Sequence, residues 1–396
     1  MRICLLTPEF LPTSGGIGTY TYNLAQGLRS RAEVHVVTAA GQNGAKVDPG
    51  LDGVQVHTIH PDGVNPKSLG LSFQFAAFRR LPELDRTHRF DVVHSNHAYM
   101  SDILVRLRRL SAVPAVTVHT TLGTQIEGTL SAGGSVPLDR RERTIARWRP
   151  LVRRIERRYL RKTAAMVFVS RWVRDHAVAR YHLAPRVSTV IPNGIDTGRL
   201  SRGGQLDGGE NRASGDRRTL LFAGRLLALK GLDTLLRALA RVDPGVRLLL
   251  AGPGDPAPWR ALARRLGVDE GRYEFLGSVP YHEMPRLYRR ADAVVLPSFS
   301  ESCPMVALEA MAAGTPLIAA SAGGVREIVT DGETGWLFSP GDADGLARTI
   351  ETVLFDPARA RGVATRARRW VEENGSLDRM AERTLRFYEA VCGAAS

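Results

Sequence analysis

The residues best suited to binding chemistry are two glutamates, Glu301 and Glu309, with seven residues between them. Glu309 is the only charged residue from Ser302 through Val325. Burying an unpaired carboxylate is costly or shifts its pKa, so Glu309 requires a strong polar partner. Ligand hydroxyls, such as those of a ribose, would satisfy it, and backbone amides of the protein are the competing explanation.

The local sequence predicts a helix over residues 305–313 that starts beside Glu301. Pro304 suits a helix start, where no amide donor is needed, and Gly314 followed by Pro316 suits its end. The free amides and the positive dipole at a helix N-terminus favour an anion such as a phosphate. The segment therefore combines carboxylates for neutral hydroxyls with a helix start for an anion.

A second candidate is the pair Arg225 and Lys230, which follows a predicted strand at 219–223. At a strand-to-helix turn, an arginine fork and a lysine point charge can converge on one diphosphate. Two solvated cations are the alternative. Lys230 is one of only four lysines among 54 basic residues, which favours a specific role for it.

Weaker signals come from glycines and histidines near the ends of predicted strands. Gly15 and Gly16 precede a predicted helix, and such glycines let the backbone approach a phosphate or a sugar. They do not form the G-x-G-x-x-G fingerprint, so no dinucleotide is implied. His119 ends a predicted strand, where a site role competes with a simple hydrogen bond to backbone. His94 and His97 compete with it for the same role.

The sequence predicts no metal site. Asp342 and Asp344 match an Asp-x-Asp motif, but they precede a predicted helix at 346–354 and suit N-terminal capping. No other carboxylate cluster, and no His or Cys cluster, has metal-binding spacing in the sequence. The three cysteines are scattered, so we expect no disulfide framework and place the protein in a reducing cytoplasm.

These residues must be positioned by strands and helices, which alternate through the chain. Continuous hydrophobic runs indicate strands that are covered on both faces of a parallel sheet. Predicted strands lie at 3–7, 34–38, 54–59, 91–94, 115–119, 166–170, 187–191, 219–223, 246–251, 273–276, 293–296 and 316–320. The predicted fold class is α/β, with two facing Rossmann-like domains that each contain a doubly wound parallel sheet.

A polar, glycine-rich segment at 198–218 indicates a loop near a domain boundary. We therefore expect an N-terminal domain at 1–196, a C-terminal domain at 197–376 and a final segment at 377–396 that contains an amphipathic helix. Open sheets of this kind bind ligands beyond the carboxyl ends of their strands, and the candidate residues follow strands.

Segment 140–162 carries a net charge of +9 out of the chain's +14. Trp148, Leu151, Ile155 and Tyr159 recur there at helical spacing, which predicts a basic helix with one apolar face. Peripheral contact with an anionic membrane, attraction of an anionic substrate and an ordinary solvated helix remain open. Nucleic acid is not expected as a partner, because no stacking platform or known module accompanies the charge. No stretch predicts a membrane-spanning helix.

Taken together, the motifs resemble the retaining glycosyltransferases of the GT4 family, which have the GT-B fold. The resemblance spans nearly the full chain, and the two spaced glutamates are its most specific element. The matching residues and stretches are Gly15-Gly16-Ile17, Phe168-Val169-Ser170, Ile191-Pro192-Asn193-Gly194-Ile195-Asp196, Gly224-Arg225-Leu226, Lys230-Gly231, Ala251-Gly252-Pro253-Gly254, Ala291-Asp292, Leu296-Pro297-Ser298, Glu301, Glu309-Ala310-Met311-Ala312-Ala313-Gly314-Thr315-Pro316, Gly323-Gly324, Glu327-Ile328-Val329, Gly332 and Thr334-Gly335.

The resemblance implies roles for residues of the second half. Arg225 and Lys230 would hold a diphosphate, Glu309 would bind ribose hydroxyls, and Glu301 would contact the transferred sugar. Backbone amides around Cys303, Met305 and Val306 would meet phosphate or sugar, and backbone near Ser278 and Val279 would hold the base. The family often has Phe-Gly where Cys303-Pro304 stand, and proline lacks an amide donor, so one expected contact is missing.

The resemblance also implies roles in the first half. Gly15 and Gly16 would allow close approach of the donor, and His119 would touch the sugar. The acceptor site is expected around residues 120–136. The final helix would cross back to the first domain.

The implied reaction transfers a hexose from a nucleotide diphosphate sugar to an acceptor hydroxyl with retained anomeric configuration, without a metal or other cofactor. UDP-sugars are favoured on general frequency, and GDP-mannose is the alternative. The acceptor is a small molecule, a glycan or a lipid, and a lipid would place the enzyme at the inner face of the cell membrane. A different GT-B reaction and a basic nucleic-acid-binding protein are the remaining rivals.

Overall fold

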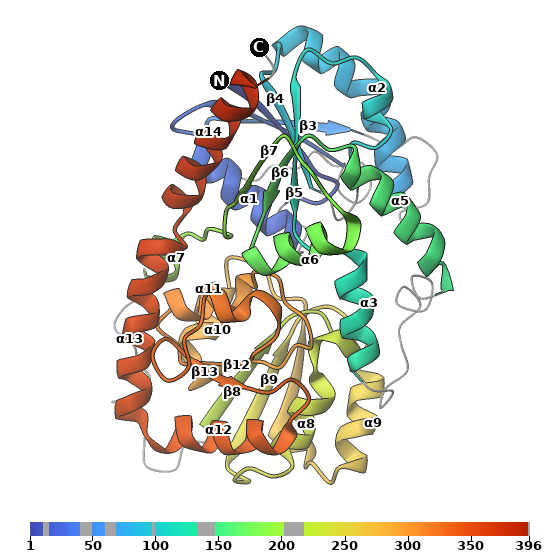
Figure 1. Ribbon diagram of the computed structural model, residues 1–396. Coiled ribbons are helices and arrows are strands. Elements are labelled where there is room, and N and C mark those ends of the chain that lie inside the picture. Colours follow the sequence, from blue (N-terminus) through green and yellow to red (C-terminus); the bar gives the residue numbers. More distant parts are fainter. Residues whose placement is uncertain are drawn as a thin grey trace. The chain divides into compact units, whose positions relative to one another are not determined.

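The computed structural model describes residues 1–10, 16–39, 50–59, 69–96, 100–132, 147–201 and 218–394 (Figure 1). The chain divides into two compact units. Unit 1 comprises Met1–Thr121, Leu151–Gly194 and Leu377–Ser396, and unit 2 comprises Leu122–Pro150 and Ile195–Ser376. Each unit contains its own parallel sheet, so the predicted fold class is confirmed.

Unit 1 is built on a seven-stranded sheet in the order β3-β2-β1-β4-β5-β6-β7. All neighbouring strands are parallel. The direction of winding reverses between β1 and β4, which is where doubly wound sheets bind ligands. The strands are β1 (Arg2–Leu6), β2 (Glu33–Ala39), β3 (Val54–Ile59), β4 (Val92–Asn96), β5 (Val113–Val118), β6 (Ala165–Phe168) and β7 (Val187–Val190).

Helices cover both faces of the first sheet, because alternate residues of its strands are apolar on each side. On one face, α1 (Gly16–Leu28) and α14 (Leu377–Gly393) share a core with Ile3, Leu5 and Val36. On the other face, α2 (Leu69–His88) packs against Cys4 and Leu6. The remaining helical segments of this part of the chain are η4 (Val105–Leu107), α5 (Arg149–Arg161) and α6 (Arg171–Tyr181).

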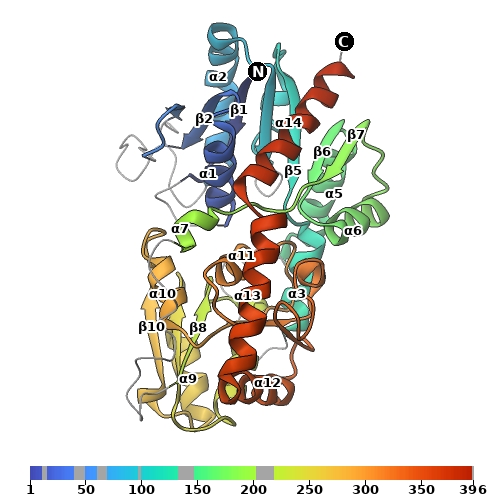
Figure 2. The ribbon, with the colours of Figure 1, turned by 90° about the vertical axis from the view of Figure 1, so that its left-hand side faces the viewer.

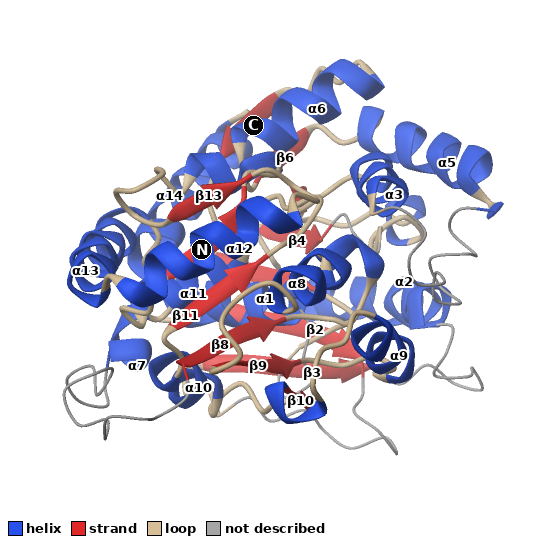
Figure 3. Ribbon diagram, turned by 90° about the horizontal axis from the view of Figure 1, so that it is seen from below, coloured by secondary structure: helices blue, strands red, loops and turns tan. Residues whose placement is uncertain are grey.

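Unit 2 has a six-stranded sheet in the order β10-β9-β8-β11-β12-β13, and its strand pairs are also parallel. Its winding reverses between β8 and β11, in the same way as in unit 1. Figure 3 shows β8, β9 and β11 as neighbouring arrows with helices around them. The strands are β8 (Arg218–Ala223), β9 (Val246–Ala251), β10 (Tyr273–Gly277), β11 (Ala293–Leu296), β12 (Leu317–Ala320) and β13 (Trp336–Phe338).

One face of the second sheet packs against three helices that contribute leucines, isoleucine and tryptophan to a shared core: α8 (Leu232–Leu239), α9 (Ala257–Arg265) and α12 (Ala343–Phe355). Helices α10 (Met284–Arg290) and α11 (Met305–Ala312) contact β8 and β11 outside that core. The other helices of unit 2 are α3 (Leu122–Ser131), α7 (Thr197–Ser201) and α13 (Pro357–Asn374). Of the helices in the described ranges, none has the length and apolar character needed to cross a bilayer.

The C-terminal helix α14 returns to unit 1, as the resemblance implied. It lies along α1 (Figure 2), and Phe387, Tyr388 and Val391 complete the core around β1. The hydroxyl of Tyr388 lies 2.6 Å from Nδ1 of His94 on β4. Residues from the two ends of the chain therefore form one hydrophobic core.

The predicted elements differ from the structure in two instructive places. Strands β3, β9 and β11 have the predicted bounds, but the three-residue strand β13 was not predicted. Helix α3 belongs to unit 2, although the sequence placed it in a domain at 1–196. Most of the predicted boundary loop at 198–218 lies outside the described residues.

Candidate functional site

The clearest charged contact among the predicted site residues joins Lys230 and Glu301. Nζ of Lys230 donates to Oε1 of Glu301 over 2.6 Å, and their side chains are 25% and 11% exposed. Lys230 follows β8 and Glu301 follows β11, the two adjacent strands at which the winding of the sheet reverses. The pair therefore lies at the edge where a doubly wound sheet binds ligands.

Gly231 explains how the chain brings these two loops together. Its φ is +71°, in the left-handed region, and a Cβ added there would lie 1.9 Å from the carbonyl oxygen of Pro297. In addition, the amide of Phe299 donates to the carbonyl of Leu229 over 2.9 Å. The loop after β8 and the loop after β11 are thus in backbone contact, and only glycine fits at the closest point.

Helix α3 packs against the same two loops. A Cβ at Gly128 would lie 2.3 Å from Cδ1 of Leu229 and 2.8 Å from Cβ of Ser300. Helix α3 falls within residues 120–136, the stretch predicted to build the acceptor site, and residues 133–136 lie outside the described ranges. Helix α3 thus lies beside the loops that carry Lys230 and Glu301.

Glu309 lies inside α11 and is only 6% exposed. Its partner is the hydroxyl of Tyr288 on α10, which donates to Oε2 over 2.6 Å. Burial raises the pKa of Glu309 above its usual range, while the Tyr288 hydrogen bond and the charge of Arg199 oppose this shift. The polar partner that we predicted for Glu309 is therefore a tyrosine hydroxyl, which forms a hydrogen bond with one of the two carboxylate oxygens.

The predicted base-binding backbone follows the edge strand β10. Ser278 is exposed and Val279 is half-buried, just after Gly277 at the strand end. Three residues further, Tyr281 is held by Arg199, whose guanidinium lies 3.7 Å above the ring centroid. Nη1 of Arg199 also donates to the Tyr281 carbonyl over 2.9 Å. This segment is therefore fixed by a cation–π contact and a backbone hydrogen bond.

The start of α11 offers backbone donors next to Glu301. Pro304 is the N-cap and provides no side-chain cap, so no cap hydrogen bond satisfies the first-turn amides. Met305 and Val306 are half-buried and Cys303 is buried. The geometry is that of a helix terminus able to accept an anion.

Arg225 follows β8 directly and is exposed. Gly224 before it has a φ of +152°, and a Cβ on the neighbouring Gly252 would lie 1.9 Å from the Gly224 carbonyl oxygen. Among the described residues, the Arg225 side chain makes no ion pair, whereas Lys230 does. The structure thus places both cations after β8 but holds only Lys230 in a fixed contact.

In unit 1, His119 lies just beyond β5. Its Nε2 is 2.9 Å from Oδ1 of Asn96, and Nδ2 of Asn96 donates to the hydroxyl of Thr21 over 3.0 Å. The ring of Tyr20 meets His119 edge-on at 4.4 Å between centroids. A Cβ at Gly16 would meet no atom of the described residues within 4 Å, and Gly15 lies outside those residues.

His94 and the Asp-x-Asp motif have structural explanations. His94 is 3% exposed, its two ring nitrogens contact Tyr388 and Thr117, and burial lowers its pKa to about 4. His97 lies outside the described residues. Asp342 caps α12 by accepting from the Gly345 amide over 2.8 Å, which confirms the predicted capping role.

Sequence reasoning missed two features. It did not predict Tyr288 and Arg199 as neighbours of Glu309, since they come from separate elements and no local pattern links them. It also missed a group of three histidines in unit 1, because these come from β2, β3 and the end of α2 and have no metal-binding spacing along the chain.

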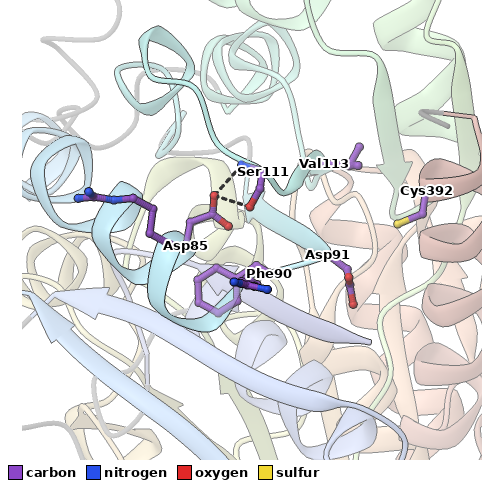
Figure 4. A pocket seen from close by; sticks show the side chains of 8 residues that line it. Asp85, Phe90, Asp91, Ser111, Val113 and Cys392 are labelled. Atoms are coloured by element: carbon purple, nitrogen blue, oxygen red, sulfur yellow. Dashed lines mark hydrogen bonds between the residues drawn. The ribbon is translucent and has the colours of Figure 1, made fainter.

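A pocket in unit 1 lies at the opposite end of the strands from the predicted site residues. It is lined around the start of β4 and β5 by Asp85, Asp91, Ser111 and Val113 (Figure 4). Oδ2 of Asp85 accepts from both the amide and the hydroxyl of Ser111, at 2.6 and 2.9 Å. The pocket is thus at the amino ends of the strands, where doubly wound sheets do not usually bind their substrate.

The basic helix α5 has the amphipathic character that the sequence predicted. Its inner face carries Glu156, which accepts from Tyr181, and Tyr159, whose hydroxyl donates to Asp102 over 2.5 Å. Leu151 and Ile155, however, are 51% and 38% exposed. Trp148, just before the helix, is 54% exposed, and exposed arginines continue along α5: Arg153, Arg154, Arg157, Arg158 and Arg161.

Comparison with known proteins gives one result for each half of the chain. The family model described as Glycosyl transferases group 1 matches residues 207–370. The model described as Glycosyltransferase Family 4 matches residues 14–199.

Relatives match along most of the chain. A glycogen synthase of Mycobacterium tuberculosis (strain CDC 1551 / Oshkosh) is 30% identical over 98% of this chain and 95% of its own. A D-inositol 3-phosphate glycosyltransferase of Mycobacterium sp. (strain JLS) is 31% identical over 91% of this chain and 81% of its own. The solved sucrose-phosphate synthase of Thermosynechococcus elongatus has a TM-score of 0.84 at 22% identity, with all of both chains covered.

Proposed function

Because the chain belongs to glycosyltransferase family 4 and is a hexosyltransferase that uses a nucleotide sugar, we propose that its donor is a UDP-hexose, with a GDP-hexose as the alternative. The hexose is transferred with retained configuration to a hydroxyl group of a small molecule or glycan. The glycogen synthase and the inositol phosphate transferase among the relatives support these two acceptor classes.

The observation that carries this proposal is the contact between Lys230 and Glu301 at the reversal point of the second sheet. A diphosphate needs a cation, and a sugar hydroxyl needs an acceptor. The pair supplies both groups within one hydrogen-bond length. When a donor binds, the diphosphate competes with Glu301 for the Lys230 ammonium, which leaves the carboxylate available to the sugar.

The neighbouring residues suit the other parts of a nucleotide sugar. The second oxygen of Glu309 accepts from ribose hydroxyls, and backbone at Ser278 and Val279 meets the base. The uncapped amides of Met305 and Val306 at the start of α11 face the phosphates or sugar. Two further residues belong to the proposed donor site. The Arg225 guanidinium adds a second positive charge beside Lys230, and the Cys303 backbone lies in the turn that precedes α11.

For the chemistry we propose front-face displacement. The bond between the anomeric carbon and the leaving diphosphate oxygen breaks, and the acceptor oxygen attacks the same face. The leaving diphosphate takes the proton of the acceptor hydroxyl. Lys230, Arg225 and the start of α11 stabilise the negative charge that develops on the diphosphate, so this reaction does not require a metal ion.

In unit 1, we propose that His119 contacts the transferred sugar and that Gly15 and Gly16 permit close approach of the donor. The hydrogen bond between His119 and Asn96 fixes the orientation of the imidazole. A Cβ at Gly16 would meet no atom of the described residues within 4 Å, which supports the close approach of a donor at this glycine.

A thermal-shift titration with UDP, GDP and ADP, each with and without Mg²⁺, tests the donor site. A nucleotide that binds only the folded protein raises the melting temperature, because it stabilises the fold by a term that grows with the logarithm of ligand concentration over Kd. We expect a shift with UDP in the absence of Mg²⁺. A shift with GDP alone would show that the donor is a GDP-hexose and not a UDP-hexose. A shift that appears only with Mg²⁺ would contradict the proposal that no metal is required. No shift with any of the three nucleotides would contradict the proposed donor site.

A second candidate function is transfer to a lipid acceptor at the inner face of the cell membrane. It is favoured by the exposed Trp148, Leu151 and Ile155 beside the exposed arginines of α5. Arginines attract anionic headgroups, and the apolar side chains can enter the interface between headgroups and acyl chains. The protein would then be a cytoplasmic enzyme that binds the membrane peripherally.

Flotation with vesicles that contain anionic phospholipid tests this candidate. Reversing the charge of four α5 arginines should abolish binding; these are Arg153, Arg154, Arg157 and Arg158. The matched control reverses four exposed arginines of unit 2, which are Arg264, Arg265, Arg361 and Arg369. Equal loss in both variants would show nonspecific charge attraction and remove the support for a lipid acceptor.

A further inference from the structure

Three histidines of unit 1 converge at one place on the face of the sheet that α2 covers. His35 lies on β2, His57 on the edge strand β3, and His88 is the last residue of α2. One ring nitrogen from each lies within 4.8 Å of those of the other two. His35 is buried, whereas His57 and His88 are half-buried, so the group borders solvent on one side.

The hydrogen bonds define which atoms are available. Nε2 of His35 lies 3.0 Å from Oε1 of Glu33, and Nδ1 of His35 lies 2.9 Å from Nε2 of His57. A carboxylate accepts, so the proton of His35 is on Nε2 and its Nδ1 carries a lone pair. This lone pair points toward His57. A carboxylate that holds the outer nitrogen of an imidazole is the usual support of a metal-binding histidine.

The end of α2 holds the third histidine in place. Arg89 adopts a φ of +52°, and its amide closes the helix by donating to the carbonyl of Asp85 over 2.7 Å. A guanidinium nitrogen of Arg2 donates to the His88 carbonyl over 3.2 Å. The chain then turns so that Phe90 packs against the rings of both His35 and His88, with centroids 5.0 and 5.7 Å away. The backbone around the cluster is therefore fixed before any ligand arrives.

Histidine imidazoles are ligands for a divalent transition-metal ion, and three of them contribute ring nitrogens to this group. In a tetrahedral zinc site with Zn–N bonds of about 2.0–2.1 Å, the nitrogens are about 3.3 Å apart. The His35 and His57 nitrogens are already closer than this, at 2.9 Å, and the His88 nitrogen lies within 4.8 Å of both.

We propose that His35, His57 and His88 bind a Zn²⁺-class divalent cation, with water in the fourth position. The cation takes the place of the His57 proton between His35 and His57, and this proton moves to Nδ1 of His57, so that no proton is released. Glu33 stays outside the coordination sphere and orients His35. The site joins β2, the edge strand β3 and the end of α2, so the bound ion stabilises unit 1 and takes no part in the sugar transfer.

Neighbouring groups agree with this choice of metal. Cys4 lies beside His35 in the strand register, but burial raises the pKa of its thiol well above the usual range, so it does not supply a thiolate. No carboxylate oxygen belongs to the group of ligand atoms among the described residues. Imidazole ligands suit Zn²⁺, Ni²⁺ and Cu²⁺, whereas Mg²⁺ prefers oxygen.

The test is calorimetric titration of untagged, EDTA-treated protein with Zn²⁺ and, separately, with Mg²⁺. We expect one equivalent of Zn²⁺ to bind, with a rise in the melting temperature, and no comparable effect of Mg²⁺. The variants His57→Gln and His88→Ala should each weaken Zn²⁺ binding at least about tenfold, and Glu33→Gln should weaken it by a smaller factor. His282→Ala, at a histidine side chain that is 82% exposed, is the control and should bind Zn²⁺ as the wild type does.

Two further outcomes decide the matter if a variant is destabilised. Each variant is compared with its own metal-free form, so a lower starting stability does not hide a metal-dependent shift. Wild-type affinity for Zn²⁺ in both His57→Gln and His88→Ala would overturn the site and place the ion elsewhere. Absence of Zn²⁺ binding to the wild type would show that the cluster is a hydrogen-bonded histidine array only.

Discussion

The two units share one strand order around their reversal points but present different chemistry there. In unit 2, the loops after β8 and β11 carry opposite charges, and Lys230 and Glu301 meet at 2.6 Å. In unit 1, a hydrogen-bonded chain runs from His119, just after β5, through Asn96 at the end of β4 to Thr21 on α1. The same topology therefore supports an ion pair in one unit and a hydrogen-bonded chain in the other, and the residues near the strand ends decide which.

In the mechanism we propose, the electrostatic part of catalysis lies in unit 2. The largest test is Lys230→Ala, which removes the fixed cation from the reversal point. We expect the rate of nucleoside diphosphate release from the donor to fall by about 10²–10³, or about 3–4 kcal/mol in the transition state. Steady-state kinetics on a variant with unchanged circular dichroism measures this.

Lys162→Ala serves as the control, because Lys162 is an exposed lysine at the end of α5. It should retain wild-type turnover with a water-soluble acceptor. Near-wild-type turnover in Lys230→Ala would show that the cation at the reversal point of unit 2 has no special role in catalysis.

A second test compares one glycine from each unit. Gly231→Ala places a Cβ against the Pro297 carbonyl at a φ of +71°, and we expect it to destabilise unit 2 by about 2 kcal/mol or more. Gly16→Ala meets nothing within 4 Å and should leave the unfolding midpoint unchanged or raise it slightly, because alanine favours the helix. Thermal unfolding of both variants without ligand measures the contrast. If Gly231→Ala and Gly16→Ala were equally stable, the close contact between the loops after β8 and β11 would not contribute to the stability of unit 2.

Glu309→Gln tests whether the buried carboxylate contributes to donor binding and is not needed for the fold. We expect donor affinity to fall roughly tenfold, since a charged acceptor contributes about 1.5 kcal/mol or more to a hydrogen bond. Tyr288 can still donate to the amide oxygen, so the fold should persist. Isothermal titration with the nucleoside diphosphate gives the affinity, and unchanged affinity would count against the ribose role.

The stability of the wild type relative to Glu309→Gln should depend on pH in a defined direction. Because the pKa of Glu309 is raised in the folded protein, the folded state holds the proton more tightly than the unfolded state. The contribution of Glu309 to the free energy of unfolding therefore decreases as pH rises from the usual carboxyl range to the raised pKa, so the wild type loses stability relative to Glu309→Gln over this range. Denaturant unfolding of both proteins at pH values from about 4 to about 8 measures the difference.

The smallest effect is expected from His119→Asn in unit 1. The change removes the imidazole and its hydrogen bond, and one hydrogen bond contributes about 1 kcal/mol, so kcat/KM should fall about fivefold. A loss as large as that of Lys230→Ala would show that unit 1 also supplies a charged or proton-transferring group. The two variants measured side by side therefore sharpen the comparison between the units.

Strand content and the fold class could be predicted from the sequence, because buried parallel strands are continuous apolar runs. The strand β13 could not, since three residues, Trp336–Phe338, are too few to show a period. The capping role of Asp342 was also predictable, because the carboxylate and the Gly345 amide it accepts from are three residues apart. Such features depend on local sequence alone.

The partners within the candidate site depend on long-range packing. The sequence predicted that Lys230 and Glu301 belong to one site, but not that they contact each other across 71 residues. Likewise, the Tyr288 hydroxyl reaches Glu309 from another helix. The three histidines of unit 1 show the limit most clearly, because only strand pairing and the end of α2 bring them together.

The return of α14 to unit 1 has a consequence for the order in which the protein folds during synthesis. His94 and Tyr388, which contact each other in the finished core, are 294 residues apart. At about 5–20 residues per second, a ribosome needs about 15–60 s to travel between them. Unit 2 is then complete while the core around β1 still lacks Phe387, Tyr388 and Val391. The first strands to leave the ribosome thus belong to the last unit to close, and chaperones that shield exposed apolar surface have that interval in which to act.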